Sequence, residues 1–178
     1  ILAIGHSARD TVEALYRQGI QMMQKPFSIG ARIEHPQELI DRAQYGRFAG
    51  HPALGAADYK LACHPPHGRG MYTFCMCPGG EVIAAASEEG GVCTNGMSCS
   101  DRAGENANSA LLVTLHPEDF PYGGTLGGMR WQREIERRAF AMSGDYRACA
   151  QTVGGFLSHT SGSASDKVRP SYRPGVCW

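Results

Sequence analysis

The sequence lacks a net charge, because 17 lysine and arginine residues balance 17 aspartate and glutamate residues among 178. No overall field would therefore draw the chain to nucleic-acid phosphates or to an anionic membrane. No apolar run approaches the roughly 20 residues that cross a bilayer, and the first residues lack the basic-then-apolar pattern of a signal sequence. These absences predict a soluble cytoplasmic protein that binds neither nucleic acid nor membrane. Small molecules and other proteins remain as possible partners.

Two nucleotide-binding motifs are also missing. No G-x-G-x-x-G pattern occurs, although a self-sufficient dinucleotide-binding domain normally carries one after its first strand. The glycine-rich segment 123–128 is followed by Met129 rather than by Lys-Ser or Lys-Thr, so it is not a phosphate-binding P-loop. We expect this segment to be a flexible connection.

The seven cysteines form an odd set without Cys-x-x-Cys spacing or the regular spacing of a disulfide framework. We expect reduced thiols at Cys63, Cys75, Cys77, Cys93, Cys99, Cys149 and Cys177. Side chains two apart on a strand share a face, so Cys75 and Cys77 could point at one ligand. His64 and His67 could complete a metal site with them. The sequence favours the alternative that these thiols are small buried hydrophobes, with no bound metal.

The hydrophobic fraction of 42% and the chain length predict one domain over residues 1–178. The first expected elements are a buried strand over Ile1–Ile4 that ends at Gly5, and a helix whose apolar residues Val12, Leu15 and Tyr16 recur at helical spacing. Alternation of apolar and polar residues then predicts a strand over 27–34, and Pro36 to Tyr45 suits a short helix.

The sequence pattern after residue 57 predicts further strands and two helices. A strand over Met71–Cys77 is expected to turn at Pro78–Gly80 and to pair with residues 81–86 in a hairpin. The other expected elements are strands over 58–62 and 109–115, helices over 131–141 and 148–157, and a mobile serine-rich loop over 158–166. This order predicts an α+β fold with a mainly antiparallel sheet flanked by helices.

Two segments are candidates for ligand binding. The turn over 5–11 follows a glycine and precedes a helix, so its free backbone N–H groups could face a cofactor or an anion; an ordinary strand-to-helix connection is the alternative. The polar segment over 104–109 suits a loop that holds a small polar ligand, and turn chemistry explains it equally well.

Several of these segments, in this order, resemble the uncharacterised FAD-dependent dehydrogenases of bacteria, a family of NAD(P)/FAD-dependent oxidoreductases. The resemblance is carried by residues 2–11, 25–37, 54–61, 74–80, 104–112 and 172–176. It implies a Rossmann-type FAD domain, split in sequence, with a substrate-side domain inserted between its halves. The chain would be that insert, with residues 1–11 and 172–178 as the edges of the FAD-binding domain. The halves of that domain would be its partners.

The resemblance also implies roles for individual residues. Gly5, His6, Ser7 and Arg9 would lie near the flavin. The turn of Cys75 and Cys77 would face the reaction cavity, where both thiols are candidates for a redox or proton-transfer role. Substrate contacts are expected from Asn106, Asn108 and Ser109.

The implied reaction is hydride transfer between the flavin and an unknown small molecule. FAD would be held by the full-length parent and not retained by this part alone. Two alternatives remain open. One is a non-catalytic binding or interaction module, metal-dependent through Cys75, Cys77 and the nearby histidines; the other is a structural insert that sets subunit contacts.

Overall fold

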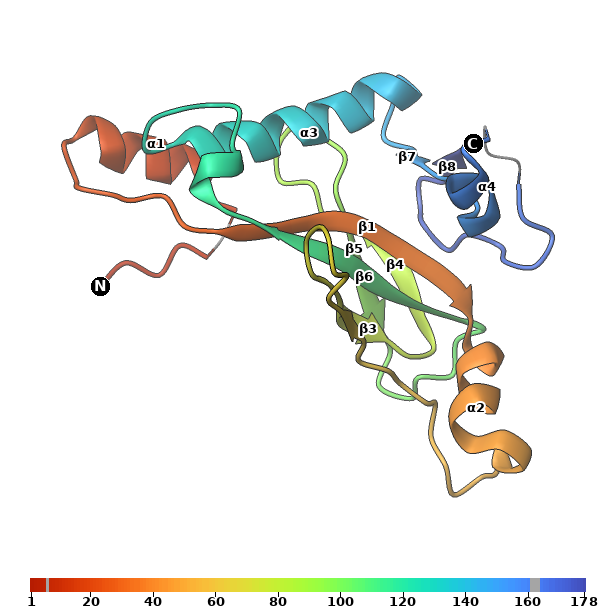
Figure 1. Cartoon of the computed structure of the whole chain (residues 1–178). Helices are drawn as coiled ribbons and strands as arrows, with labels where there is room; N and C mark the ends of the chain where they lie inside the picture. The colour runs from red at the N-terminus through yellow and green to blue at the C-terminus, as the bar shows by residue number, and fades with distance from the viewer. Residues whose placement is uncertain (6, 161–163) are drawn as a thin grey trace.

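The chain forms an α+β fold around a four-stranded antiparallel sheet. The computed structural model describes residues 1–5, 7–160 and 164–178. The sheet contains β1 (Phe27–Pro36), β2 (Ala62–Cys63), β3 (Met71–Cys77) and β6 (Asn106–Leu115) in the order β1-β6-β3-β2. Strands β1 and β6 pair along their whole length and run through the middle of the molecule in Figure 1. The predicted α+β class and mainly antiparallel sheet are confirmed.

Two smaller pairs of strands accompany this sheet. Strands β4 (Gly80–Ala84) and β5 (Thr94–Ser98) form an antiparallel pair, and β7 (Ala148–Cys149) and β8 (Val176–Cys177) form a short parallel pair. The predicted hairpin between Met71–Cys77 and residues 81–86 is therefore wrong. Both edges of β3 are occupied, one by β2 and one by β6, so the chain passes directly into the second sheet.

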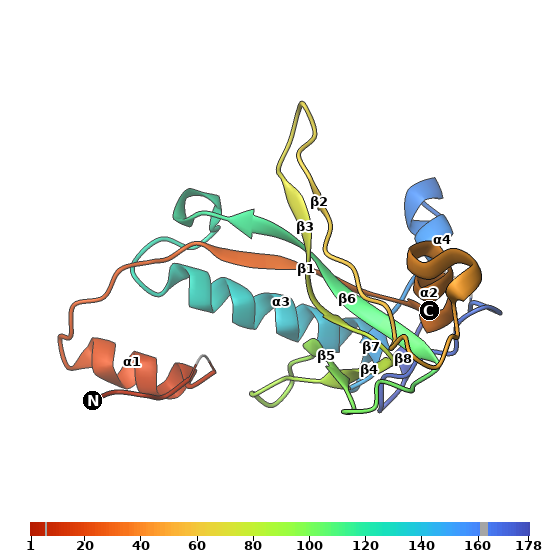
Figure 2. The same cartoon turned by 90° about the horizontal axis from the view of Figure 1, so that it is seen from below.

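The helices lie outside the main sheet. They are α1 (Arg9–Arg17), α2 (Gln37–Tyr45), α3 (Gly127–Ser143) and α4 (Val153–Ser158), with 3-10 turns η1 (Gly46–Phe48) and η2 (Pro117–Asp119). Helix α3 runs alongside β1 and β6, whereas α2 continues from the end of β1 (Figures 1 and 2). The helices predicted over 36–45 and 131–141 are confirmed. None of the helices in the described ranges is both long and apolar enough to cross a membrane.

Four other predictions from the sequence need correction. Residues Ile1–Ile4 form no strand, and Ile1 and Leu2 are exposed. A strand needs a hydrogen-bonded neighbour, and these four residues belong to none of the strand pairs of the described structure. The strand predicted over 58–62 shortens to β2. The segment 123–128 is not merely a connection, since its last two residues begin α3. The helix predicted over 148–157 begins instead as β7, whose backbone bonds to β8. The predicted loop over 158–166 includes residues 161–163, which lie outside the described residues.

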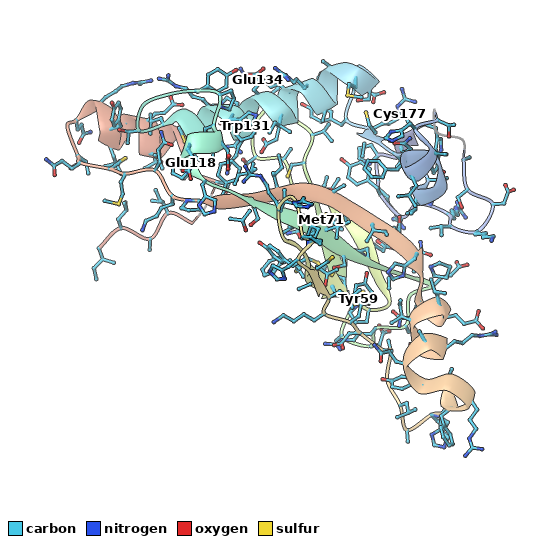
Figure 3. The ribbon with its side chains drawn as sticks, in the orientation of Figure 1. Tyr59, Met71, Glu118, Trp131, Glu134 and Cys177 are labelled. Carbon is cyan, nitrogen blue, oxygen red and sulfur yellow. The ribbon has the colours of Figure 1, made fainter. Side chains whose placement is uncertain are left out.

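An aromatic cluster packs the start of α3 against the sheet. Phe27 of β1 stacks on Phe120 with ring centroids 5.0 Å apart, and Trp131 of α3 lies 6.2 Å from Phe27 and 5.8 Å from Phe120. Figure 3 shows Trp131 on the side of α3 that faces the sheet. A Cβ atom at Gly128 would lie 2.8 Å from the Phe120 ring, so only glycine allows this close approach.

An ion-pair network fastens α1 to α3. The buried guanidinium of Arg9 donates to both carboxylate oxygens of Glu136, at 2.9 and 2.6 Å. Arg133 donates to Glu88 at 2.7 and 2.8 Å and to Glu13 at 2.8 Å. The hydrogen bonds that Arg133 donates to Glu88 and Glu13 raise the pKa of Arg133, and the pKa of Glu88 is lowered chiefly by Arg133. The network joins α1 and the loop before β5 to one face of α3.

Candidate functional site

Arg32 of β1 connects the two sheets. Its Nη1 atom donates to Asn108 Oδ1 at 2.5 Å and to the carbonyl oxygen of Cys75 at 3.3 Å. Its Nη2 atom donates to Asn95 Oδ1 of β5 at 3.2 Å. These three acceptors are neutral, so none of them cancels the positive charge of the guanidinium. A Cβ atom at Gly96 would lie 2.2 Å from both Arg32 Nη1 and Asn108 Oδ1, which explains the glycine at this position of β5.

Asn108 and Ser109 are fully buried next to each other on β6. Successive side chains of a strand point to opposite faces, so Asn108 shares the face of Arg32 whereas Ser109 lies on the other face. Asn108 Nδ2 has no hydrogen-bond partner within the described residues, and Ser109 Oγ donates to the carbonyl oxygen of Phe74 at 3.2 Å. Their expected role as substrate contacts stays a prediction.

Cys75 and Cys77 occupy different surroundings at the end of β3. The backbone of Cys75 adopts a left-handed φ of 48°, and the pairing of β3 with β6 shifts register between Phe74 and Cys77. The regular alternation that predicted a shared face is therefore interrupted: Cys75 is exposed and Cys77 is buried. Burial, followed by the neighbouring Cys75, raises the pKa of the Cys77 thiol, and Arg32 only partly opposes this.

A raised pKa makes Cys77 a poor nucleophile near neutral pH, because the thiolate is the reactive form. Among the described residues no group of three or more histidine, cysteine, aspartate or glutamate side chains is arranged to hold a metal ion. The alternative of a metal site built from Cys75, Cys77, His64 and His67 thus has no assembled ligand set among these residues. A catalytic role of the two thiols stays a prediction.

The opposite face of the sheet carries a second polar contact. His35 Nε2 and Tyr59 Oη lie 2.9 Å apart, and their rings are tilted at a centroid distance of 5.6 Å. Burial raises the pKa of Tyr59, and a hydrogen bond with Ser109 partly lowers it. No sequence pattern predicted this contact, since Tyr59 lies in a loop 24 residues away from His35.

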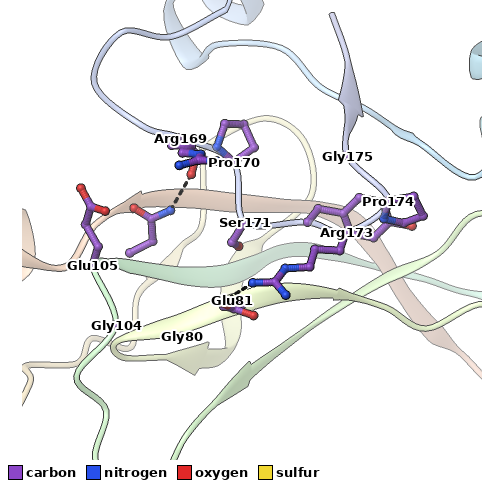
Figure 4. Close-up of a pocket in the computed structure, with 12 residues that line it drawn as sticks. Gly80, Glu81, Gly104, Glu105, Arg169, Pro170, Ser171, Arg173, Pro174 and Gly175 are labelled. Atoms are coloured by element: carbon purple, nitrogen blue, oxygen red, sulfur yellow. Dashed lines mark hydrogen bonds and ion pairs between the residues drawn. The ribbon is translucent and has the colours of Figure 1, made fainter.

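A pocket of about 540 Å³ opens where three segments meet (Figure 4). It is lined by Gly80 and Glu81, by residues 104–106, and by residues 169–175. Its charged lining residues include Arg169, Arg173, Glu81 and Glu105. Asn106, expected to contact substrate, does line this pocket, whereas Asn108, Ser109 and the two cysteines do not.

Glu34 at the end of β1 holds two of these segments together. Its carboxylate accepts hydrogen bonds from Asn106 Nδ2 at 2.9 Å and from the Ser171 hydroxyl at 2.5 Å. Asn106 Nδ2 also donates to the carbonyl oxygen of Arg169 at 2.9 Å, and the Ser171 hydroxyl accepts from Val82 N at 2.8 Å. The wall formed by residues 169–175 is therefore fixed to β1, β6 and β4.

The pocket can hold a small polar molecule by its charges and backbone groups. Arg169 and Arg173 supply guanidinium donors that suit carboxylate or phosphate groups, while Glu81 and Glu105 can accept from hydroxyl or amine donors. The sequence reasoning missed Glu34, Arg169, Ser171 and Arg173. The repeated Arg-Pro pairs at 169–170 and 173–174 were the available signal, because proline fixes the backbone beside each arginine.

A second pocket of about 510 Å³ lies at the far end of β3 and β6. Its lining includes His64, Arg69 and His116. Arg69 is closely paired with Asp119, at 2.5 and 2.7 Å, whereas Arg173 in the pocket of Figure 4 meets Glu81 only at 3.9 Å.

The turn before α1 was expected to lie near a flavin. Gly5 is exposed with a positive φ of 69°, and Ser7 O accepts from Arg9 N at 2.9 Å. His6 lies outside the described residues. The Arg9 side chain is bound by Glu136 and Glu88, so it is not free to meet a phosphate. The described residues of this turn therefore do not fit a dinucleotide cradle by themselves, and proximity to a flavin stays a prediction.

Comparison with known proteins identifies the family. A curated "Uncharacterized protein" from Clostridium beijerinckii is 52% identical over 177 residues, which are 98% of this chain. The chain spans only 33% of the length of that relative. The family described as "FAD-dependent protein, C-terminal domain-like" matches residues 26–178. This match covers all the strands and the pocket of Figure 4, and the chain therefore belongs to the FAD-dependent protein, C-terminal domain-like family.

Proposed function

We propose that the chain is the substrate-facing domain of a cytoplasmic FAD-dependent oxidoreductase, which transfers a hydride between its flavin and a small polar molecule. The observation that carries the proposal is the family match over residues 26–178. The partial coverage of the relative supports a longer parent, in which residues 1–11 and 172–178 border an FAD-binding domain. We propose the halves of that domain as the partners of this chain.

The pocket of Figure 4 is the proposed substrate site. Its wall formed by residues 169–175 overlaps, over residues 172–175, the segment that would border the FAD-binding domain in the proposed parent. Arg169 and Arg173 would orient an anionic group of the substrate. Asn106 would present its amide beside them, because Glu34 fixes that side chain in place. FAD would supply the hydride chemistry in the full-length protein.

The visible absorption spectrum tests this proposal. The protein at its full natural length and residues 1–178 alone are purified in parallel and compared at equal concentration. A flavin band in the full-length protein and none in residues 1–178 is the expected result, because the chain lacks a dinucleotide-binding motif. A full-length protein that is colourless and takes up no added FAD would refute the proposal.

Substitutions at the pocket then test where the substrate binds. A dye-linked screen of small polar molecules identifies a substrate of the full-length enzyme. Arg173→Ala should raise the KM for that substrate about tenfold or more and leave the flavin band unchanged, because a charge-assisted hydrogen bond contributes about 1.5–3 kcal/mol. Arg42→Ala on the distant, exposed face of α2 is the control and should keep the wild-type KM. Equal KM values for both variants would remove the pocket from the mechanism.

The two thiols need a separate test. Cys75→Ala and Cys77→Ala should both lower kcat if the thiols move a proton or an electron pair. Because Cys77 has a raised pKa, its contribution should grow towards alkaline pH. Unchanged kcat across the pH range would exclude both thiols from the mechanism.

A further inference from the structure

Two cysteines face each other across the parallel pair of β7 and β8. Cys149 and Cys177 are direct partners in the register, and their Sγ atoms lie 3.4 Å apart. Two backbone hydrogen bonds frame them, from Ala148 N to Gly175 O at 3.0 Å and from Ala150 N to Cys177 O at 2.8 Å. Figure 3 shows Cys177 beside the short strands at the end of α3.

The spacing of these strands suits a disulfide bond. Neighbouring strands lie about 4.8 Å apart, and disulfides form at Cα separations of about 4.4–6.8 Å. The Sγ atoms must approach from 3.4 Å to about 2.05 Å, which rotation about the Cα–Cβ bonds can provide without breaking the strand pair. Cys149 is exposed and Cys177 is half-buried, so an external oxidant can reach the pair.

We propose that Cys149 and Cys177 form a reversible dithiol–disulfide pair that is oxidised by a small-molecule disulfide and fastens the wall of the neighbouring pocket. The thiolate of Cys149, the more exposed of the two, attacks one sulfur of the small disulfide, and one small thiol leaves. The thiolate of Cys177 then attacks the Cys149 sulfur of the mixed disulfide and releases the second small thiol. Two protein thiols are oxidised, one small disulfide is reduced to two thiols, and the protons of Cys149 and Cys177 pass through solvent to the departing thiolates.

Because of where the two cysteines lie, a disulfide between them would affect the pocket wall. Strand β8 follows Gly175 directly, so the pocket wall formed by residues 169–175 lies within the covalent loop that the bond would close. The other end of the wall is held by Glu34 through Ser171. Oxidation would join this end of the wall covalently to β7, which follows the end of α3. Reduction would leave this end held by the backbone hydrogen bonds of the short parallel pair. This inference concerns the chain itself and does not depend on the proposed reaction.

The pKa of Cys149 supports a slow, pH-dependent exchange. It is raised by burial and by the hydrogen bond with Cys177, so the thiolate fraction is small near neutral pH. We expect formation of the disulfide to accelerate as the pH rises above the ordinary thiol range of about 8.5.

Peptide mapping of the full-length protein tests the pairing. The protein is reduced, equilibrated with graded mixtures of reduced and oxidised glutathione, alkylated with iodoacetamide and digested with trypsin. Trypsin cleaves after Arg147 and Lys167 but not at the two Arg-Pro bonds that follow, so each cysteine of the pair lies on its own peptide. The expected product is a linked pair of peptides that begin at Ala148 and Val168, and dithiothreitol should separate them.

Substitutions make the mapping specific. Cys149→Ser and Cys177→Ser should each abolish the linked pair. The double variant Cys63→Ser/Cys99→Ser is the matched control, since it removes two other exposed thiols and should retain the linked pair in full. The proposal fails if saturating oxidised glutathione yields only glutathione adducts, or if Cys149 becomes linked to a cysteine other than Cys177.

Native-state proteolysis tests the effect on the pocket wall. Cleavage after Lys167, just before the wall, should be about tenfold slower in the oxidised protein than in the reduced protein, because the bond suppresses local opening. In Cys177→Ser the same treatment with glutathione should leave the cleavage rate unchanged. A disulfide that forms without slowing this cleavage would overturn the proposed fastening of the wall.

Discussion

Replacement of Arg32 by methionine should destabilise the fold far more than its partly exposed position suggests. The substitution removes three hydrogen bonds to Asn108, Cys75 and Asn95. It also leaves Asn108, which is 0% exposed, with neither polar side-chain atom paired within the described ranges, because Nδ2 already lacks a partner there. A buried polar atom without a partner costs about 1–3 kcal/mol, and each lost bond from a charged donor adds to that.

Solvent reaches part of the Arg32 side chain, so water replaces some of the lost hydrogen bonds and the individual free-energy costs should not be added in full. We expect Arg32→Met to lower the free energy of unfolding by about 3 kcal/mol, which reduces the ratio of folded to unfolded protein about a hundredfold. Urea unfolding of the full-length protein measures this loss. Arg42→Met is the matched control, because Arg42 pairs with Glu38 at the surface, where both side chains are at least 70% exposed. It should cost less than about 0.5 kcal/mol.

A double substitution separates the buried amide from the rest of the effect. Asn108→Leu removes the unpaired polar atoms, so Arg32→Met/Asn108→Leu should cost at least about 1 kcal/mol less than the sum of the two single substitutions. If Arg32→Met and Arg42→Met unfold at the same urea concentration, or if the double substitution is additive, the reasoning about Arg32 is refuted.

Three further predictions follow from particular contacts. The lowered pKa of Glu88 beside Arg133 means that the unfolded chain binds more protons there, so this contact stabilises the fold above the ordinary glutamate pKa of about 4.3 and is lost as the pH falls through the lowered pKa; Glu88→Gln should lower the Tm at neutral pH, and its difference in Tm from the wild type should shrink as the pH falls below that range. Gly128→Val should force the aromatic cluster apart and cost about 1–3 kcal/mol in urea unfolding, whereas Gly123→Ala, with open space around it, should not. Glu34→Gln should accelerate native-state tryptic cleavage after Lys167 about tenfold, because it weakens the carboxylate contacts that hold the pocket wall; an unchanged cleavage rate would show that the wall does not depend on Glu34.

Local patterns in the sequence predicted most of the long elements. The helices over 36–45 and 131–141 follow from apolar spacing within a few turns, and the strand that became β1 follows from alternation within ten residues. The hairpin of β3 failed for a reason that local patterns do not contain. Whether a strand can accept a new neighbour depends on which strands already occupy its edges, and β6, which occupies one edge of β3, lies some 30 residues further along the chain.

Residues of the candidate site were predicted only where one short segment of the sequence was itself unusual in composition. Asn106 stood out because the segment 104–109 is polar and suits a loop; β6 already begins at Asn106, yet this residue does line the pocket. Glu34 and Ser171 lie 137 positions apart in the sequence, and no pattern of short range could bring them together. Cys149 and Cys177 were counted among reduced thiols without a partner, because their proximity arises from a parallel strand pair across 28 positions.

The pocket wall is held at two points of different chemical character, and this difference has consequences for control of the site. Near its start, Ser171 is held by hydrogen bonds to the Glu34 carboxylate, so that contact is weakened when the charge of residue 34 is removed by substitution. Past its end, Cys177 meets Cys149, so that contact responds to thiol oxidation. We expect oxidation to slow cleavage after Lys167 about tenfold and Glu34→Gln to accelerate it about tenfold, so each change is worth about 1.4 kcal/mol in the opening of the wall. Oxidation could therefore compensate for Glu34→Gln, and proteolysis after Lys167 in the oxidised variant should return to about the rate of the reduced wild type. If oxidation does not rescue the variant, the two contacts do not act on the same wall.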